Sequence, residues 1–186
     1  MNILIKYKII LIVLILALAA GAFWYLGSDN GGEAAKNEEK DYPFTNPDLK
    51  ARYTDPDLNF FVDYPEGFTV NNTGEENVKV LVFSKANSEE SFQIFIMPYD
   101  EPGPITPERI LIDQPEIVMK DPQTVPIAGE EALVFFSADP DIGDVREVWF
   151  VHPSTTLGAS GRLYQASTYA KYDELLAKVM RTFRFK

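Results

Sequence analysis

The chain ends on LLAKVMRTFRFK, residues 175–186, where apolar side chains recur at helical spacing and lead into Phe-Arg-Phe. C-terminal tails are usually polar and frayed. The apolar residues of this ending fall at i, i+3, i+4, i+7, i+8 and i+11, which predicts one face of an amphipathic helix: Tyr172, Leu175, Leu176, Val179, Met180 and Phe183. We therefore expect the C-terminus to belong to the hydrophobic core, so that truncating it would unfold the domain.

The residues before this helix alternate between apolar and other side chains, as β-strands do. The alternation predicts strands around residues 60–64, 68–70, 78–83, 92–97, 132–137, 145–152 and 162–170. Thr106 followed by Pro107 predicts the start of a short helix. Several strands are apolar on both faces, so the sheet must be covered on both sides. The predicted fold class is α+β, an antiparallel β-sheet flanked by helices.

The N-terminal part of the chain contains 18 uncharged residues, 9–26. As a helix they would be about 27 Å long, close to the thickness of the hydrocarbon core of a bilayer. Lys6 and Lys8 precede this run and Asp29 follows it. The positive-inside rule then predicts a cytoplasmic N-terminus, residues 1–8, and a transmembrane signal anchor, residues 9–27.

Two alternatives to this anchor remain open. A cleaved signal peptide is one, because Ala17-Leu18-Ala19 and Ala20-Gly21-Ala22 both have the small-x-small form of a cleavage site. A buried helix of a soluble protein is the other. The anchor and the signal peptide both place residues 28–186 outside the cytoplasm.

The polar stretch after residue 27 predicts a linker, residues 28–57, and an extracytoplasmic domain, residues 58–186. The linker is charged and interrupted by Pro43, Pro47 and Pro56. Leu49 and Tyr53 are unusual in a solvated linker, which suggests that its latter part packs on the domain.

Composition excludes several classes of site. The chain has no cysteine and one histidine, His152, so it has no disulfide, thiolate metal site or lipid-anchor cysteine. Residues 28–186 carry 15 bases and 28 acids, a net charge of −13. Such a surface repels nucleic acid, so we expect no nucleic-acid partner. No phosphate-binding loop, dinucleotide fingerprint or metal-spaced histidine pair is present, and we expect no cofactor.

Three stretches resemble PsbP-like domains: FFVDYPEGFTV (60–70), VPIAGEEALVFF (125–136) and RLYQASTYAKYDELLAKVMRTFRF (162–185). Their order and spacing cover residues 59–185. The resemblance implies a PsbP-like α/β/α sandwich of the PsbP/DcrB type, and a role in binding or assembly without catalysis. It points to the small single-pass bacterial PsbP-related proteins. This chain lacks a plastid transit peptide, so a photosynthetic role is not implied.

The loop DPDIGD, residues 139–144, brings Asp139, Asp141 and Asp144 together, and calcium binds several such oxygens. The spacing is not that of an EF-hand, and a hairpin turn is the favoured interpretation. No metal site is therefore predicted beyond this calcium candidate.

His152 and Ser154 raise the alternative of an envelope hydrolase, but no G-x-S-x-G elbow is present, so we predict no enzyme. The polar loop after His152 is a candidate binding loop through Ser154, Thr155 and Thr156. The proline-rich stretch 96–107 is another, through an exposed Tyr99.

The sequence thus predicts a membrane-anchored extracytoplasmic binding or assembly module, with a membrane protein as its expected partner. The alternative function is a carrier or sensor of a small apolar ligand, held in a pocket between sheet and helices.

Overall fold

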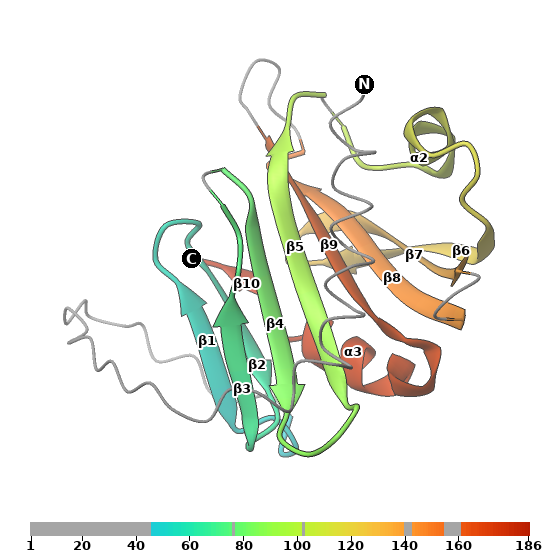
Figure 1. The fold of residues 1–186 in the computed structure, drawn as a ribbon. Helices are drawn as coiled ribbons and strands as arrows, with labels where there is room; N and C mark the ends of the chain where they lie inside the picture. The colour runs from blue at the N-terminus through green and yellow to red at the C-terminus, as the bar shows by residue number, and fades with distance from the viewer. Residues whose placement is uncertain (1–45, 76, 102, 140–142, 155–160) are drawn as a thin grey trace.

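The structure is a computed structural model that describes residues 46–75, 77–101, 103–139, 143–154 and 161–186. Two antiparallel sheets make up most of it (Figure 1). The larger sheet has the strand order β3-β4-β5-β9-β8-β7-β6. Its strands are β3 (Phe68–Asn72), β4 (Lys79–Lys85), β5 (Ser91–Tyr99), β6 (Met119–Ile127), β7 (Glu130–Asp139), β8 (Gly143–His152) and β9 (Gly161–Tyr169).

The smaller sheet has the order β1-β2-β10 and contains β1 (Ala51–Asp55), β2 (Phe60–Tyr64) and β10 (Arg184–Phe185). A 3-10 turn, Ala170–Tyr172, leads from β9 into α3 (Asp173–Met180). The described part of the chain holds one other helix, α2 (Pro107–Asp113). The predicted strands around 78–83 and 92–97 pair as β4–β5, and those on either side of the turn predicted at 139–144 pair as β7–β8.

The larger sheet is apolar on both faces, as predicted. One face packs against α3 and the smaller sheet, through rings such as Phe83, Phe92 and Phe150. The other face packs against Ile105, which precedes α2, and against Ile110, which lies within α2. The fold contains more β-structure than the predicted sandwich. One face of the larger sheet, where helices were expected, is covered by α3 and the smaller sheet together.

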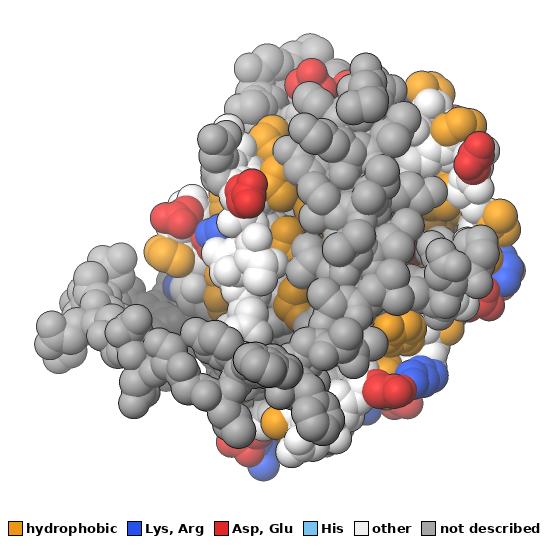
Figure 2. Space-filling view, in the orientation of Figure 1, with side chains coloured by type: hydrophobic (Ala, Val, Ile, Leu, Met, Phe, Trp, Pro, Cys, Tyr) orange, Lys and Arg blue, Asp and Glu red, His pale blue; other side chains and the backbone are white. Residues whose placement is uncertain are grey.

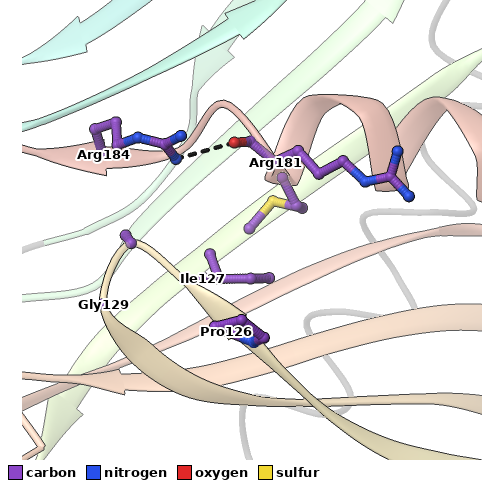
Figure 3. A pocket seen from close by; sticks show the side chains of 7 residues that line it. Pro126, Ile127, Gly129, Arg181 and Arg184 are labelled. Carbon is purple, nitrogen blue, oxygen red and sulfur yellow. Dashed lines mark hydrogen bonds between the residues drawn. The ribbon is translucent and has the colours of Figure 1, made fainter.

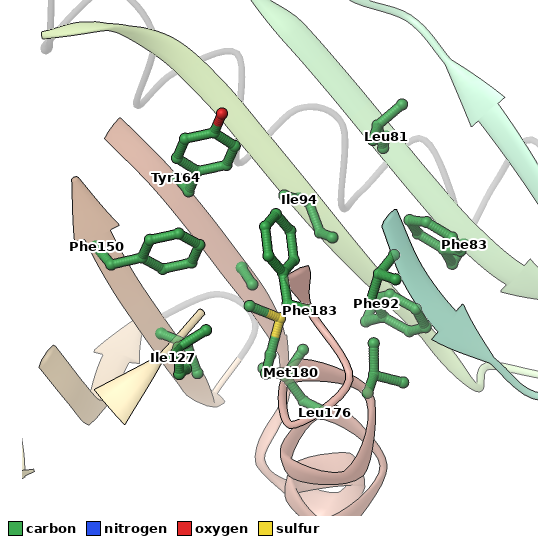
Figure 4. Packing of buried hydrophobic residues seen from close by; sticks show 14 of the residues in the cluster. Leu81, Phe83, Phe92, Ile94, Ile127, Phe150, Tyr164, Leu176, Met180 and Phe183 are labelled. Atoms are coloured by element: carbon green, nitrogen blue, oxygen red, sulfur yellow. The ribbon is translucent and has the colours of Figure 1, made fainter. Parts of the chain in front are cut away.

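The aromatic ring of Phe183 lies at the centre of the first face (Figure 4). It stacks on Phe60 of β2 with ring centroids 4.7 Å apart. It makes edge-to-face contacts with Phe150 and Tyr164 of the larger sheet, with ring centroids 5.4 and 5.8 Å apart. Phe183 therefore joins the two sheets, which explains the apolar ending of the chain.

The C-terminal helix is shorter than the stripe predicts, since α3 ends at Met180. The hydroxyl of Thr182 donates to the carbonyl of Val179 at 2.7 Å and accepts from the N–H of Asp63 at 2.9 Å. This side chain turns the chain out of the helix and fastens it to β2. Phe183 is buried at the end of that turn, immediately before β10.

The domain begins before the predicted boundary at residue 58. Residues 51–55, assigned to the linker, form β1 and pair with β2. Leu49 is 1% exposed and belongs to the core, as its apolar side chain suggested. Proline and charge in this stretch indicated a linker, but pairing with β2 and burial of Leu49 outweigh that local preference.

The predicted anchor, residues 9–27, lies outside the described residues and stays a prediction. Within the described part of the chain, no helix is long and apolar enough to cross a membrane.

The buried carboxylate of Asp55 links the two sheets. It accepts from the Nζ of Lys79 in β4 at 2.5 Å, from the Tyr53 hydroxyl, and from the backbone N–H groups of Asp57 and Leu58. Burial by itself raises the pKa of Asp55, but Lys79 and the other donors outweigh burial and hold the pKa below its ordinary value of 3.8.

We expect Phe183→Ala to lower the free energy of unfolding by about 3–5 kcal/mol, because a large buried ring is replaced by a cavity. Chemical unfolding of the full chain in non-ionic detergent, followed by circular dichroism, measures this. Ile112→Ala is the control, since Ile112 is 72% exposed and its truncation should change stability by less than about 0.5 kcal/mol. Equal effects of the two substitutions would contradict the central place of Phe183.

We expect the Asp55 carboxylate to stabilise the fold above its unfolded pKa, and this contribution to be lost as pH falls through the lower folded pKa. Lys79→Met removes the strongest group that lowers this pKa, so the variant should be less stable at neutral pH and should lose less stability than the wild type as pH falls. Unfolding free energies between pH 7 and pH 2 measure the difference. Lys85→Met, which removes an exposed pair with Glu90, should leave the pH profile unchanged.

Candidate functional site

The predicted calcium loop lies only partly within the described residues. Asp141 is outside them, and Asp139 ends β7. The carboxylate of Asp144 is paired with the Nζ of Lys120 at 2.8 Å, which joins β8 to β6. Among the described residues, no group of three or more His, Asp or Glu side chains could hold a metal ion. The calcium prediction therefore remains untested, and Asp144 has a structural partner.

The second predicted binding surface differs from expectation at Tyr99. This side chain is 8% exposed and packs in the core on the α2 face, so the expectation of an exposed Tyr99 is wrong. Burial raises the pKa of Tyr99, and the carboxylate of Glu101 adds to the rise. The stretch is rich in proline, but the alternation of β5 continues to Tyr99 and turns its ring inward.

Glu130, His152 and Ser154 form a cluster that the sequence did not predict as a unit. The register that pairs Leu133 with Trp149 continues to place Glu130 opposite His152. The Glu130 carboxylate contacts the Nδ1 atom of His152 at 2.7 Å and accepts a hydrogen bond from the Ser154 hydroxyl. Counting back along the β7–β8 hairpin would have indicated this pair. Thr155 and Thr156 lie outside the described residues.

This cluster does not have the arrangement of a hydrolase triad. In a triad the histidine lies between the acid and the serine and takes the serine proton. Here the acid lies between the other two groups, and the Ser154 hydroxyl donates to Glu130. The His152 ring also stacks on Phe185, with centroids 3.4 Å apart. The three side chains fasten the end of β8 to the β6–β7 turn and to β10.

Packing within the domain does not explain why hydrophobic side chains on and after α2 are exposed at the surface. The described residues include three large hydrophobic side chains that are exposed: Leu111 at 43%, Ile112 at 72% and Val118 at 50%. We call these three residues the α2 patch. Figure 2 shows hydrophobic side chains at the surface over α2, with an acidic side chain beside them. Such a concentration is typical of an interaction surface.

The α2 patch is held in place by the capping of α2. The Thr106 hydroxyl accepts from the N–H of Arg109, as the predicted N-cap requires. The Arg109 guanidinium contacts both Glu101 and Asp113, and the hydrogen bonds to Glu101 and Asp113 raise its pKa. Ile110 is 1% exposed and anchors the helix to the sheet. The backbone beneath the patch is therefore fixed at both ends.

The sequence contains the signal for this patch, although it was missed. Residues 110–112 are Ile-Leu-Ile within a helix of seven residues. Successive helical side chains point about 100° apart, so a helix lying on a sheet can bury only some of three consecutive residues. Ile110 is buried, and Leu111 and Ile112 are consequently exposed.

Comparison with known proteins gives structural neighbours at low sequence identity. No family model and no curated protein matches the chain. The solution structure of cyanobacterial PsbP (CyanoP) from Synechocystis is similar with a TM-score of 0.46 and 12% identity, over 78% of this chain and 98% of that protein. A PsbP is therefore among the structures that this chain resembles, as the sequence motifs predicted.

A crystal structure from Bacteroides thetaiotaomicron is similar with a TM-score of 0.46 and 12% identity, over 73% of this chain. The match covers 48% of that protein, so this chain spans about half its length.

We expect Glu130→Ala to lower the free energy of unfolding by about 1 kcal/mol or more, because His152 and Ser154 both lose their acceptor. Thermal and chemical unfolding of the full chain measure the loss. Glu131→Ala is the matched control, since this neighbouring glutamate is exposed and should change stability by less than about 0.5 kcal/mol. A neutral Glu130→Ala would show that the cluster does not fasten β8.

Proposed function

We propose that this chain is a non-catalytic binding module, held outside a membrane by residues 9–27, that docks on a protein partner through the α2 patch. The observation that carries the proposal is the exposure of Leu111 and Ile112 on α2, and of Val118 five residues after its end, in a chain whose other large hydrophobics, among the described residues, are at least partly buried. Hydrophobic side chains left exposed in one place favour contact with another protein.

The charge around the patch favours a basic partner surface. Glu108 and Glu116 are exposed beside it, and neither has an ion pair among the described residues. The excess of acids over residues 28–186 adds to the same field. A partner with an apolar centre and lysine or arginine at its rim would match the patch in both chemistry and charge.

The membrane tether would compensate for the small size of the patch. Three side chains bury less area than a stable interface between free proteins needs. A flexible connection of residues 28–45 would span on the order of 25 Å. It would keep the domain close to a membrane protein, so that a contact of low intrinsic affinity is occupied.

Two other functions are less well supported by the geometry. The Glu130–His152–Ser154 cluster lacks the contact between histidine and serine that a hydrolase would use. The interior between the larger sheet and α3 contains stacked rings, such as Phe83 on Phe92 and Phe150 on Tyr164. These rings occupy the place where an apolar ligand was expected to lie.

We expect a photo-crosslinking amino acid at position 112 to capture one membrane protein in stoichiometric amount when the full chain is in its native membrane. Position 88, in the exposed β4–β5 turn, is the control and should capture none of it. Val118→Asp should reduce the product from position 112, because it adds a charge to the α2 patch.

Equal labelling from positions 112 and 88 would exclude the α2 patch as the docking surface. Loss of the product on deletion of residues 1–27, with the fold intact by circular dichroism, would support the tether. An unchanged yield from that deletion would contradict the tether while leaving the patch in place.

A further inference from the structure

A depression of about 330 Å³ lies between the β6–β7 turn and the end of α3 (Figure 3). This volume is at the lower end of small-molecule sites. The lining residues come from two parts of the chain that are distant in sequence: Pro126, Ile127, Ala128, Gly129, Met180, Arg181 and Arg184.

The shape of the depression follows from two chain reversals. The turn between β6 and β7 has two residues, Ala128 and Gly129, both with positive φ, at 52° and 90°. Such a turn matches the twist of a hairpin and keeps its tip narrow. On the other side, α3 ends and the chain turns back toward β10. Ile127 and Met180, which are 7% and 2% exposed, form an apolar floor between the two reversals.

Two arginine side chains border this floor. In Figure 3 the Arg184 guanidinium lies on the side of Gly129, and the Arg181 side chain extends in the opposite direction, away from Arg184. The Nη1 atom of Arg184 donates to the carbonyls of Arg181 and Phe183, at 2.9 and 2.6 Å. These bonds fix the Arg184 guanidinium in place and leave its Nε and Nη2 atoms for other acceptors.

The two arginines differ from most others in the described chain. Arg52, Arg109 and Arg146 each form an ion pair with an aspartate or glutamate. Arg181 and Arg184 have no carboxylate partner among the residues that the structure describes. In a chain with 28 acids and 17 bases, two guanidinium groups without a carboxylate partner among the described residues, at the borders of one depression, raise the positive potential there.

Capping of α3 explains only part of this arrangement. Cations are favourable near a helix C-terminus, and one amino group of Arg184 satisfies carbonyls there. Capping does not require a second arginine or an apolar floor between the helix end and a hairpin tip. A ligand with both a negative charge and an apolar part would use all three features.

We propose that this depression binds a small organic anion, a phosphate or carboxylate attached to a short apolar chain. Arg184 holds the anionic group, since guanidinium donors match the oxygens of phosphate and carboxylate, and Arg181 adds positive charge at the opposite border. The apolar chain lies over Ile127, Met180 and Pro126. This site is independent of the α2 patch, and either can exist without the other.

Isothermal titration calorimetry of the full chain in maltoside detergent tests the site. The probes are hexyl phosphate below its micellar concentration, inorganic phosphate and hexanol. We expect saturable binding of hexyl phosphate, and at least about tenfold weaker binding of the other two probes, because each lacks one half of the recognised chemistry. Inorganic phosphate that binds as tightly as hexyl phosphate would overturn the proposal.

Substitutions locate the binding. Arg184→Gln should weaken hexyl phosphate binding at least about tenfold, and the double variant with Arg181→Gln should abolish it. Lys85→Gln removes one charge in β4, which β5, β9, β8 and β7 separate from β6, and should leave binding unchanged. Wild-type affinity in a folded Arg184→Gln variant would overturn the proposal.

Short-chain lipids distinguish the source of the anion. Dihexanoyl phosphatidylglycerol that binds through Arg184, while dihexanoyl phosphatidylcholine does not, would identify an anionic lipid headgroup. Binding of hexyl phosphate without either lipid would identify a free organic anion. Absence of saturable heat with hexyl phosphate and with dihexanoyl phosphatidylglycerol would overturn the proposal.

Discussion

The packing of Phe183 against Phe60, Phe150 and Tyr164 is the interaction on which the rest of the domain depends. β10 has only two residues, too few for backbone pairing alone to hold it in the smaller sheet. The buried ring immediately before it supplies the apolar area that keeps it there. Because Arg184 and Phe185 follow directly, the Phe185–His152 stack and the place of Arg184 beside the β6–β7 turn both depend on this ring.

The two faces of the larger sheet are closed in different ways. Stacked aromatic rings fill the face under α3 and the smaller sheet, and the Asp55–Lys79 pair locks the two sheets together. The other face carries α2, a helix of seven residues that buries Ile110 and exposes Ile112. The proposed docking and ligand sites accordingly lie at helix ends and turns, where side chains can vary without disturbing the core.

Much of this fold could be predicted from local pattern. Alternation identified the two hairpins, Thr106 identified the start of α2, and helical spacing identified the buried face of α3. The prediction failed where a distant partner decides the outcome. Residues 51–55 have the composition of a linker but pair with β2, and Tyr99 begins a proline-rich stretch yet faces the core. Local preference is small compared with the free energy of burial, which depends on the whole fold.

The sequence by itself determined which side chains line the apolar face of each helix and strand, because the spacing of residues on one face follows from backbone geometry. It also determined the acidic charge and the lack of cysteine. Only the tertiary structure decided which faces meet. The Ser154 hydroxyl bonds Glu130 and not His152, and Arg181 lies beside a turn more than fifty positions earlier in the chain. Sequence periodicity shows which side chains share a face of one helix or strand. Contacts between residues that are far apart in the sequence depend on how whole elements pack.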